Sequence, residues 1–111
     1  MYEGVIIKET LTDELFLDHL TIDNVEICKT NSAIKYWTLI YFHSETDDLP
    51  QRLSAVIIEN WFADMKSNNV KYIIFKDKIL KYEIGNAADK EKVLDVMRSW
   101  GIPDNQFNWS E

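Results

Sequence analysis

Alternating apolar and polar positions over residues 61–84 predict a meander of three antiparallel strands. In this interpretation residues 61–66 form the first strand, and a three-residue turn over 76–78 joins the second strand to the third. Asp64 then lies beside Lys71 as a cross-strand pair of opposite charge. A helix over the first of these segments gives no such agreement, so the strand interpretation is favoured.

The turn over 76–78 would place Phe75 opposite Ile79, and an even-length turn between the first two strands would place Met65 opposite Val70. A shift of one residue would move every side chain of a strand to the other face, so we expect burial to select this register. Burial of each large apolar side chain contributes ~1.5–3 kcal/mol, so exposing the whole face to water would cost a free energy that rivals the stability of a domain. The face expected to be buried consists of Trp61, Ala63, Met65, Val70, Tyr72, Ile74, Leu80, Tyr82 and Ile84.

The rest of the chain predicts three further strands, over residues 3–10, 25–29 and 35–43, and a short helix within residues 11–20. In that short helix Thr12 is the expected N-cap. Its expected shared face holds Leu15, Phe16, His19 and Leu20.

Two longer helices are indicated by their caps and apolar stripes. The first begins at Asp48 and carries Leu49, Leu53, Val56 and Ile57. The second begins at Asn86, and Gly101 is expected at its C′ position. Its apolar face holds Val93, Val96, Met97 and Trp100. The prediction is a single α+β domain over 1–111, in which a two-layer, largely antiparallel sheet of five or six strands packs its main apolar face against both helices.

The other face of the predicted meander has an apolar patch made of Phe62, Ile73, Phe75 and Ile79. Cover by a helix or by the N-terminal segment is the favoured interpretation, and a protein contact or a ligand site is the alternative. Phe107 and Trp109 are large apolar groups near the end of the chain. They are expected to dock on the core, or else to form a partner arm in a homodimer.

Composition narrows the functional classes. The chain has 111 residues, 46% of them apolar, which suits one folded domain. Its 19 acidic residues exceed its 12 basic ones, so nucleic-acid binding is not expected. A single cysteine, Cys28, excludes an internal disulfide and fits a reducing compartment. With no signal-peptide pattern and no apolar run long enough for a membrane span, we expect a cytoplasmic protein and no membrane contact.

No catalytic, cofactor or metal signature stands out. His43 precedes an acidic stretch that holds Glu45, Asp47 and Asp48, but the stretch lacks the glycine and the final glutamate of a calcium loop. His19 is expected to be a structural residue of its helix. Cys28 is expected to be a small core residue, because nothing beside it in the sequence would lower the pKa of its thiol. We therefore expect no cofactor and no metal, and an enzyme is not the favoured class.

Three segments, "NWFADMK", "YIIFKDKILKYEI" and "RSWGIPDNQFNW", resemble motifs of a widespread family of small uncharacterised bacterial proteins. The opening "YEGVIIKETL" and "YWTLIY" extend the resemblance over most of the chain, which departs from the motifs at Phe62 and Met65 and has a shorter middle. The resemblance implies a strand at residues 61–66 and supplies no activity and no catalytic residue. The matching positions are Trp61, Ala63, Asp64, Ile73, Ile74, Phe75, Lys78, Gly101, Ile102, Pro103 and Gln106.

Three functional hypotheses remain open. The leading one is a binding or regulatory domain that contacts another protein or a second copy of itself through aromatic surface. The second is a small-ligand binder or small enzyme with a pocket near Trp61, Asp64, Tyr72 and His43. The third and weakest is an acidic decoy of a nucleic-acid enzyme.

Overall fold

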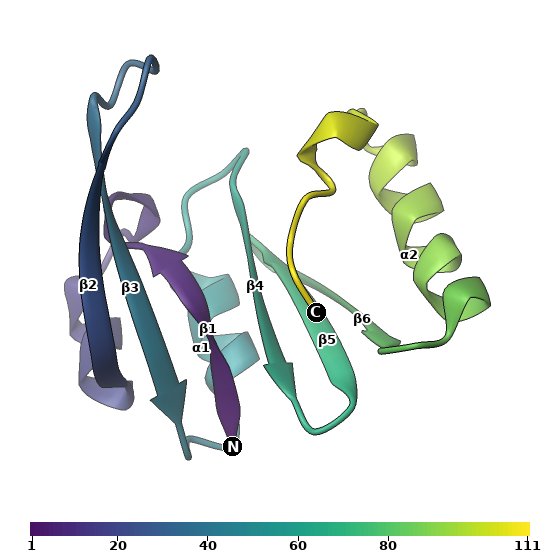
Figure 1. Cartoon of the computed structure of the whole chain (residues 1–111), viewed down its shortest axis with the longest axis horizontal. Coiled ribbons are helices and arrows are strands. Elements are labelled where there is room, and N and C mark those ends of the chain that lie inside the picture. The colour runs from purple at the N-terminus through teal and green to yellow at the C-terminus, as the bar shows by residue number, and fades with distance from the viewer.

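The computed structural model describes residues 1–111 and contains one antiparallel sheet of six strands (Figure 1). In chain order the strands are β1 (Tyr2–Ile7), β2 (Thr21–Lys29), β3 (Tyr36–Ser44), β4 (Phe62–Ser67), β5 (Val70–Phe75) and β6 (Lys78–Glu83). Their order across the sheet is β2-β3-β1-β4-β5-β6. The helices are α1 (Leu49–Val56) and α2 (Ala87–Ser99), with short 3-10 segments η1 (Lys8–Thr10), η2 (Glu14–His19) and η3 (Asp104–Gln106). The predicted α+β class is confirmed.

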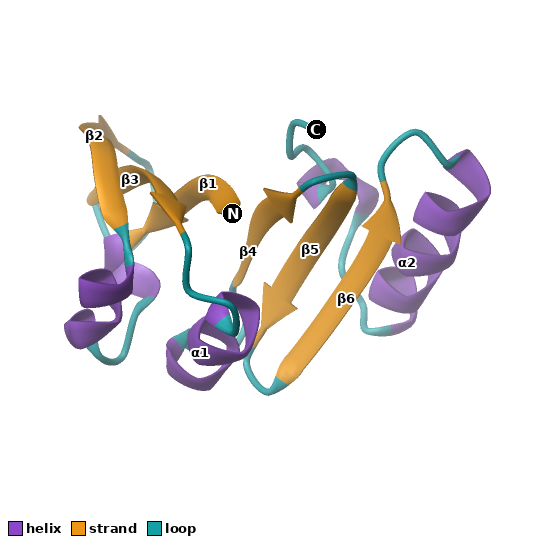
Figure 2. Cartoon of the chain, turned by 90° about the horizontal axis from the view of Figure 1, so that it is seen from below, coloured by secondary structure: helices purple, strands orange, loops and turns teal.

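The two helices pack against opposite faces of the sheet, so the prediction that both cover one face is wrong. In Figure 2, α1 lies below the sheet and the C-terminal end of the chain lies above it. The α1 face buries one core, made of Ile6, Phe16, Ile40, Phe42, Leu49, Leu53, Ile57, Met65 and Ile74. The α2 face buries a second core, made of Ile73, Tyr82, Val93 and Met97. Ile73 and Ile74 are neighbours in β5, and their side chains enter different cores.

The hairpin of β5 and β6 has a two-residue turn, and the predicted three-residue turn is wrong. Phe75 pairs with Lys78, and Asp77 in the turn has a positive φ of 60°. This one-residue shift puts Tyr82 on the α2 face and Ile79 beside Ile74 on the α1 face. The predicted register rested on a single buried face. Because α2 buries the second face as well, the shorter turn exposes no large apolar group to water.

Strand β4 has the predicted side-chain faces but a register shifted by two residues. Met65 lies opposite Tyr72 instead of Val70, because the connecting turn is two residues shorter than expected. A shift of two residues keeps each side chain on its own face. Asp64 and Lys71 therefore meet diagonally, with 2.6 Å between the carboxylate oxygen and the ammonium nitrogen.

Helix α2 has the capping that the sequence predicts. The Asn86 side chain accepts a hydrogen bond from the Asp89 N–H at 3.0 Å. At the other end Gly101 has a φ of 82°, and the Ile102 N–H donates to the Met97 carbonyl at 3.2 Å. This is the hydrogen bond of a Schellman motif, and it ends the helix where glycine relieves the strain of a positive φ.

The other elements differ in detail from the prediction. The segment expected as one strand from residue 3 to residue 10 ends as a strand at Ile7 and continues as η1. The short helix η2 is capped by Asp13 instead of Thr12, and Leu15 is 67% exposed, outside the core face expected for it. At the start of α1, Asp48 makes no capping hydrogen bond. Its carboxylate accepts one from Arg52 at 2.7 Å instead, and this contact lowers the pKa of the Asp48 carboxyl.

Candidate functional site

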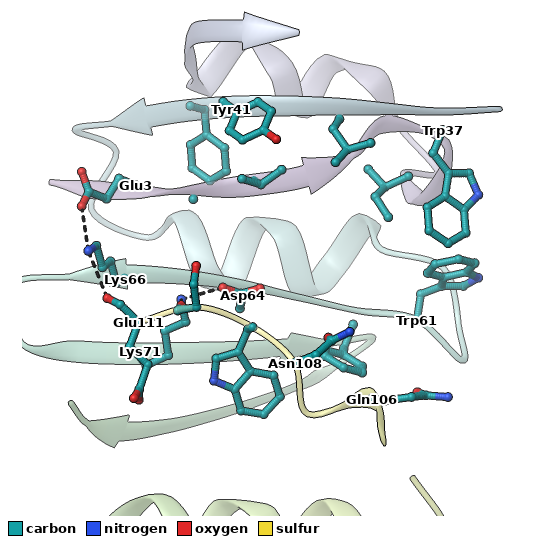
Figure 3. A pocket seen from close by; sticks show the side chains of 18 of the residues that line it. Glu3, Trp37, Tyr41, Trp61, Asp64, Lys66, Lys71, Gln106, Asn108 and Glu111 are labelled. Atoms are coloured by element: carbon teal, nitrogen blue, oxygen red, sulfur yellow. Dashed lines mark hydrogen bonds and ion pairs between the residues drawn. The ribbon is translucent and has the colours of Figure 1, made fainter. Parts of the chain in front are cut away.

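One half of the α2 face carries no helix. Helix α2 and the C-terminal segment 105–111 cover β4, β5 and β6, whereas the same face of β1 and β3 is bare. A groove of about 1000 Å³ lies there (Figure 3). Its apolar floor is made of half-buried side chains of β1 and β3, namely Val5, Ile7, Leu39 and Tyr41. The C-terminal segment forms one wall.

The groove is aromatic at one end. Trp37 of β3 and Trp61, just before β4, meet edge to face with their ring centroids 5.2 Å apart. The indole nitrogen of Trp37 is buried and has no hydrogen-bond partner, although buried Trp N–H groups usually have one. This end therefore offers two large ring surfaces, and the unpaired indole N–H is buried.

The opposite end is charged, and its ammonium groups are already paired. Lys66 lies 3.4 Å from the Glu3 carboxylate and 3.1 Å from the backbone oxygen of Glu111. The buried ammonium group of Lys71 contacts Asp64 and also donates to the Ser110 carbonyl, each at 2.6 Å. Carboxylates outnumber ammonium groups around the groove, because Asp23 and Glu111 also line it.

The C-terminal wall is anchored to the second core. The Trp109 indole N–H donates to the Tyr82 hydroxyl at 2.8 Å, and that hydroxyl donates to the Glu111 carboxylate at 2.5 Å. Burial, followed by the hydrogen bond to Glu111, raises the pKa of Tyr82 above its ordinary range. The Trp109 ring also meets Phe62 edge to face at 6.0 Å. The wall is thus held by apolar contact and by hydrogen bonds.

The predicted apolar patch is covered within the chain. Ile73 is fully buried in the second core, and Phe62 and Phe75 pack against that core. Phe75 also meets Trp100 edge to face at 5.2 Å. Ile79, predicted to belong to the same patch, lies on the α1 face because it pairs with Ile74 in the β5–β6 hairpin. Phe107 and Trp109 dock on the second core, as the favoured interpretation of the tail expects.

The pocket predicted near Trp61, Asp64, Tyr72 and His43 does not form as a unit. Trp61 and Asp64 both line the groove. Tyr72 lies on the α1 face, where it meets Tyr2 edge to face at 5.6 Å. The Nδ1 atom of His43 lies 2.9 Å from the Asp23 carboxylate, and His43 is absent from the lining of the groove.

Sequence reasoning missed most of the groove. Trp37, Leu39 and Tyr41 alternate along a segment that was identified only as a strand. Their period of two was the available signal that they share a face. Asp23 was missed because β2 begins at Thr21, four residues before the predicted strand. Cys28 is half-buried on this edge strand and is not a core residue.

The structure contains no group of three or more His, Cys, Asp or Glu side chains arranged to hold a metal ion. Neither helix has the length and apolar character that a membrane-crossing helix requires. Comparison of the chain with protein-family models, curated proteins and solved structures finds no match. The resemblance to the bacterial family stays a prediction.

Proposed function

We propose that this protein is a non-enzymatic binding module whose site is the groove over β1 and β3. The observation that carries the proposal is that the second face of the sheet is only half covered, so apolar residues of β1 and β3 form an open floor. An exposed apolar surface with a polar rim is typical of an interaction site. A cytoplasmic location is part of the proposal and rests on the sequence alone.

The occupant that fits the groove best is an extended segment of a partner protein with basic and apolar side chains. Apolar side chains of the segment would lie on the floor and against Trp37 and Trp61. Basic side chains would be attracted by the carboxylates that line the groove, because these outnumber its two ammonium groups, Lys66 and Lys71. The net charge of −7 favours encounter with a cationic partner as well.

The arrangement of titratable groups supports binding over catalysis. A general acid or base must lie within hydrogen-bond reach of the group with which it exchanges a proton. Asp64 is engaged by the buried ammonium of Lys71. His43 does not line the groove and is engaged by Asp23. No nucleophile with an adjacent base lines the groove. A small enzyme and an acidic decoy remain the weaker hypotheses.

The test is selection of peptides from a random library displayed on phage, with the immobilised protein as target. Selected peptides are then titrated into the protein, and tryptophan fluorescence reports binding. Trp37→Ala should weaken binding about 30-fold, since an aromatic anchor at an interface contributes ~2 kcal/mol or more. Tyr36→Ala is the matched control, because Tyr36 is the preceding residue of β3 and points to the other face.

The expected result is enrichment of peptides with basic and apolar residues that bind the wild type and the Tyr36→Ala variant alike. Their affinity should fall as salt is added, because the attraction to the carboxylates of the groove is screened. Peptides that bind the Trp37→Ala variant as tightly as the wild type would show that the groove is not the site. Circular dichroism of each variant establishes that the fold is kept.

A further inference from the structure

Strand β2 is an open edge of the sheet. It pairs with β3 on one side and with no strand on the other, and it lies at the outer side of the molecule in Figure 1. It is 9 residues long, and nearly all of them are exposed. Proteins usually shorten, cover or charge such edges, because the free backbone groups accept another strand. Strand β2 carries three charged residues and a bulge between Ile22 and Asn24, but from Val25 to Lys29 it pairs regularly with β3 and its outer side stays uncovered.

The hydrogen bonds of β3 show which groups of β2 face outward. Thr38 lies opposite Ile27, but the Thr38 N–H donates to the Glu9 carboxylate on the far side of β3. Opposed residues in antiparallel strands exchange both hydrogen bonds or neither, so Ile27 and Thr38 exchange none. The amide and the carbonyl of Ile27 therefore point to the open edge, and so do those of Val25 and Lys29, two residues away on either side.

The same stretch of β2 presents an apolar stripe on the α1 face. Ile22, Val25 and Ile27 lie opposite Phe42, Ile40 and Thr38, respectively, and Ile40 and Phe42 belong to the first core. The three side chains of β2 are 45%, 51% and 70% exposed. Tyr36 continues the stripe on β3 and is exposed as well. The edge thus combines unpaired backbone groups with apolar side chains.

We propose that two copies of this chain associate by antiparallel pairing of β2 with β2, which extends the sheet across a two-fold axis at Ile27. In this register Ile27 of one copy lies opposite Ile27 of the other, and the two residues exchange both backbone hydrogen bonds. Val25 lies opposite Lys29 of the second copy, whose aliphatic stem can cover it. On the other face Glu26 lies opposite Cys28. No two like charges meet between residues 25 and 29.

Charge and the bulge disfavour the neighbouring registers toward the start of β2. Pairing of Val25 with Ile27 would place Glu26 of one copy against Glu26 of the other, and directly opposed like charges destabilise a sheet. Pairing of Val25 with Val25 would place Ile27 opposite the bulge at Asp23, where the regular pairing of the strand is interrupted. The edge is therefore self-complementary in the Ile27-centred register, which favours a second copy over an unrelated strand as its occupant.

The first measurement is the mass of the wild-type protein in solution, by sedimentation equilibrium over the micromolar concentration range. We expect a concentration-dependent rise toward twice the 13.1 kDa of one chain. A mass that stays at that of one chain throughout the range overturns the proposal. A dimer leaves the register to be tested.

Cysteine cross-linking tests the register, because Cys28 is the only cysteine. Glu26→Cys puts a second thiol opposite Cys28 of the other copy, so mild oxidation should convert most of the protein to a covalent dimer. Asn24→Cys is the matched control, because its thiol would meet Cys28 only in the register that opposes the two Glu26 residues. Cross-linking of the control, or of neither variant while the mass shows a dimer, overturns the proposed pairing.

An edge variant checks the apolar stripe. Ile27→Asp should shift the dissociation constant at least 100-fold, because it places two carboxylates at the axis. Leu15→Asp changes a similarly exposed apolar residue of η2, away from the β2 edge, and should leave the mass distribution unchanged. Equal association of the Ile27→Asp variant and the wild type overturns the proposal, provided that circular dichroism shows a folded chain.

Discussion

Because the ammonium group of Lys71 is buried, the two ways of breaking its ion pair with Asp64 should destabilise the fold by unequal amounts. The Lys71 side chain is 5% exposed and the Asp64 side chain is 30% exposed. Asp64→Asn removes the countercharge and leaves the ammonium with the Ser110 carbonyl as its remaining charge-compensating contact. Lys71→Met removes the buried charge itself and leaves Asp64 in partial contact with water.

Breaking a buried pair by removing one partner costs ~3–5 kcal/mol when the other charge stays buried, so Asp64→Asn should cost about 3 kcal/mol. Lys71→Met should cost only about 1 kcal/mol, because the methionine fills the space and the remaining carboxylate is partly hydrated. The double variant should resemble Lys71→Met, which gives a coupling of roughly 3 kcal/mol.

Urea unfolding followed by circular dichroism measures these differences. With a slope of about 1.5 kcal/mol per molar urea, Asp64→Asn should lower the midpoint by about 2 M and Lys71→Met by less than 1 M. Glu3→Gln provides the exposed control, because its pair with Lys66 is largely solvated and should contribute less than about 1 kcal/mol. If Lys71→Met were as destabilising as Asp64→Asn, the argument from the buried charge would be refuted.

Three further predictions concern stability. Gly4→Ala should cost about 1–3 kcal/mol in urea unfolding, because its Cβ would lie 2.9 Å from the backbone oxygen of Asp64; a neutral effect would show that β1 and β4 can move apart. Burial alone would raise the pKa of Glu9, but hydrogen bonds from the Thr38 N–H and hydroxyl outweigh it and lower that pKa. The stability advantage of wild type over Glu9→Gln should thus be full at neutral pH and lost as the pH falls through the folded-state pKa, and an advantage that grew in acid would contradict this sign. Trp109→Ala should cost about 2–3 kcal/mol, roughly half to three-quarters of the cost at a fully buried tryptophan, and an unchanged melting temperature would show that the wall is not anchored.

The sequence predicted best what local chemistry determines. Both ends of α2 were identified because Asn86 and Gly101 perform their usual capping roles in the residues next to them. The faces of β4 were also identified, because alternation survives a two-residue error in register. The Asp64–Lys71 contact was predicted for the same reason, although the two residues are diagonal neighbours.

The register of β5 and β6 was not predictable from the hairpin alone. It depends on whether the second face is buried, and the residues that bury it, such as Val93 and Met97, come later in the chain. Asp77 also adopts a positive φ, which only a few residue types tolerate well and which no residue type requires. The groove was missed for a similar reason, because its floor and its wall are brought together by pairing of β1 with both β3 and β4.

The second core has a consequence for how the molecule opens. Its members all come from one continuous stretch of chain, from Phe62 to Trp109. The first core holds α1 and both halves of the sheet together without α2 or the C-terminal segment. Helix α2 and that segment can therefore detach as one cooperative unit while the first core stays intact. In native-state hydrogen exchange, the amides of α2 should become exposed at a lower free energy than those of β1 and β3. Such an opening would also remove one wall of the groove, so occupancy of the groove and protection of α2 would be thermodynamically linked.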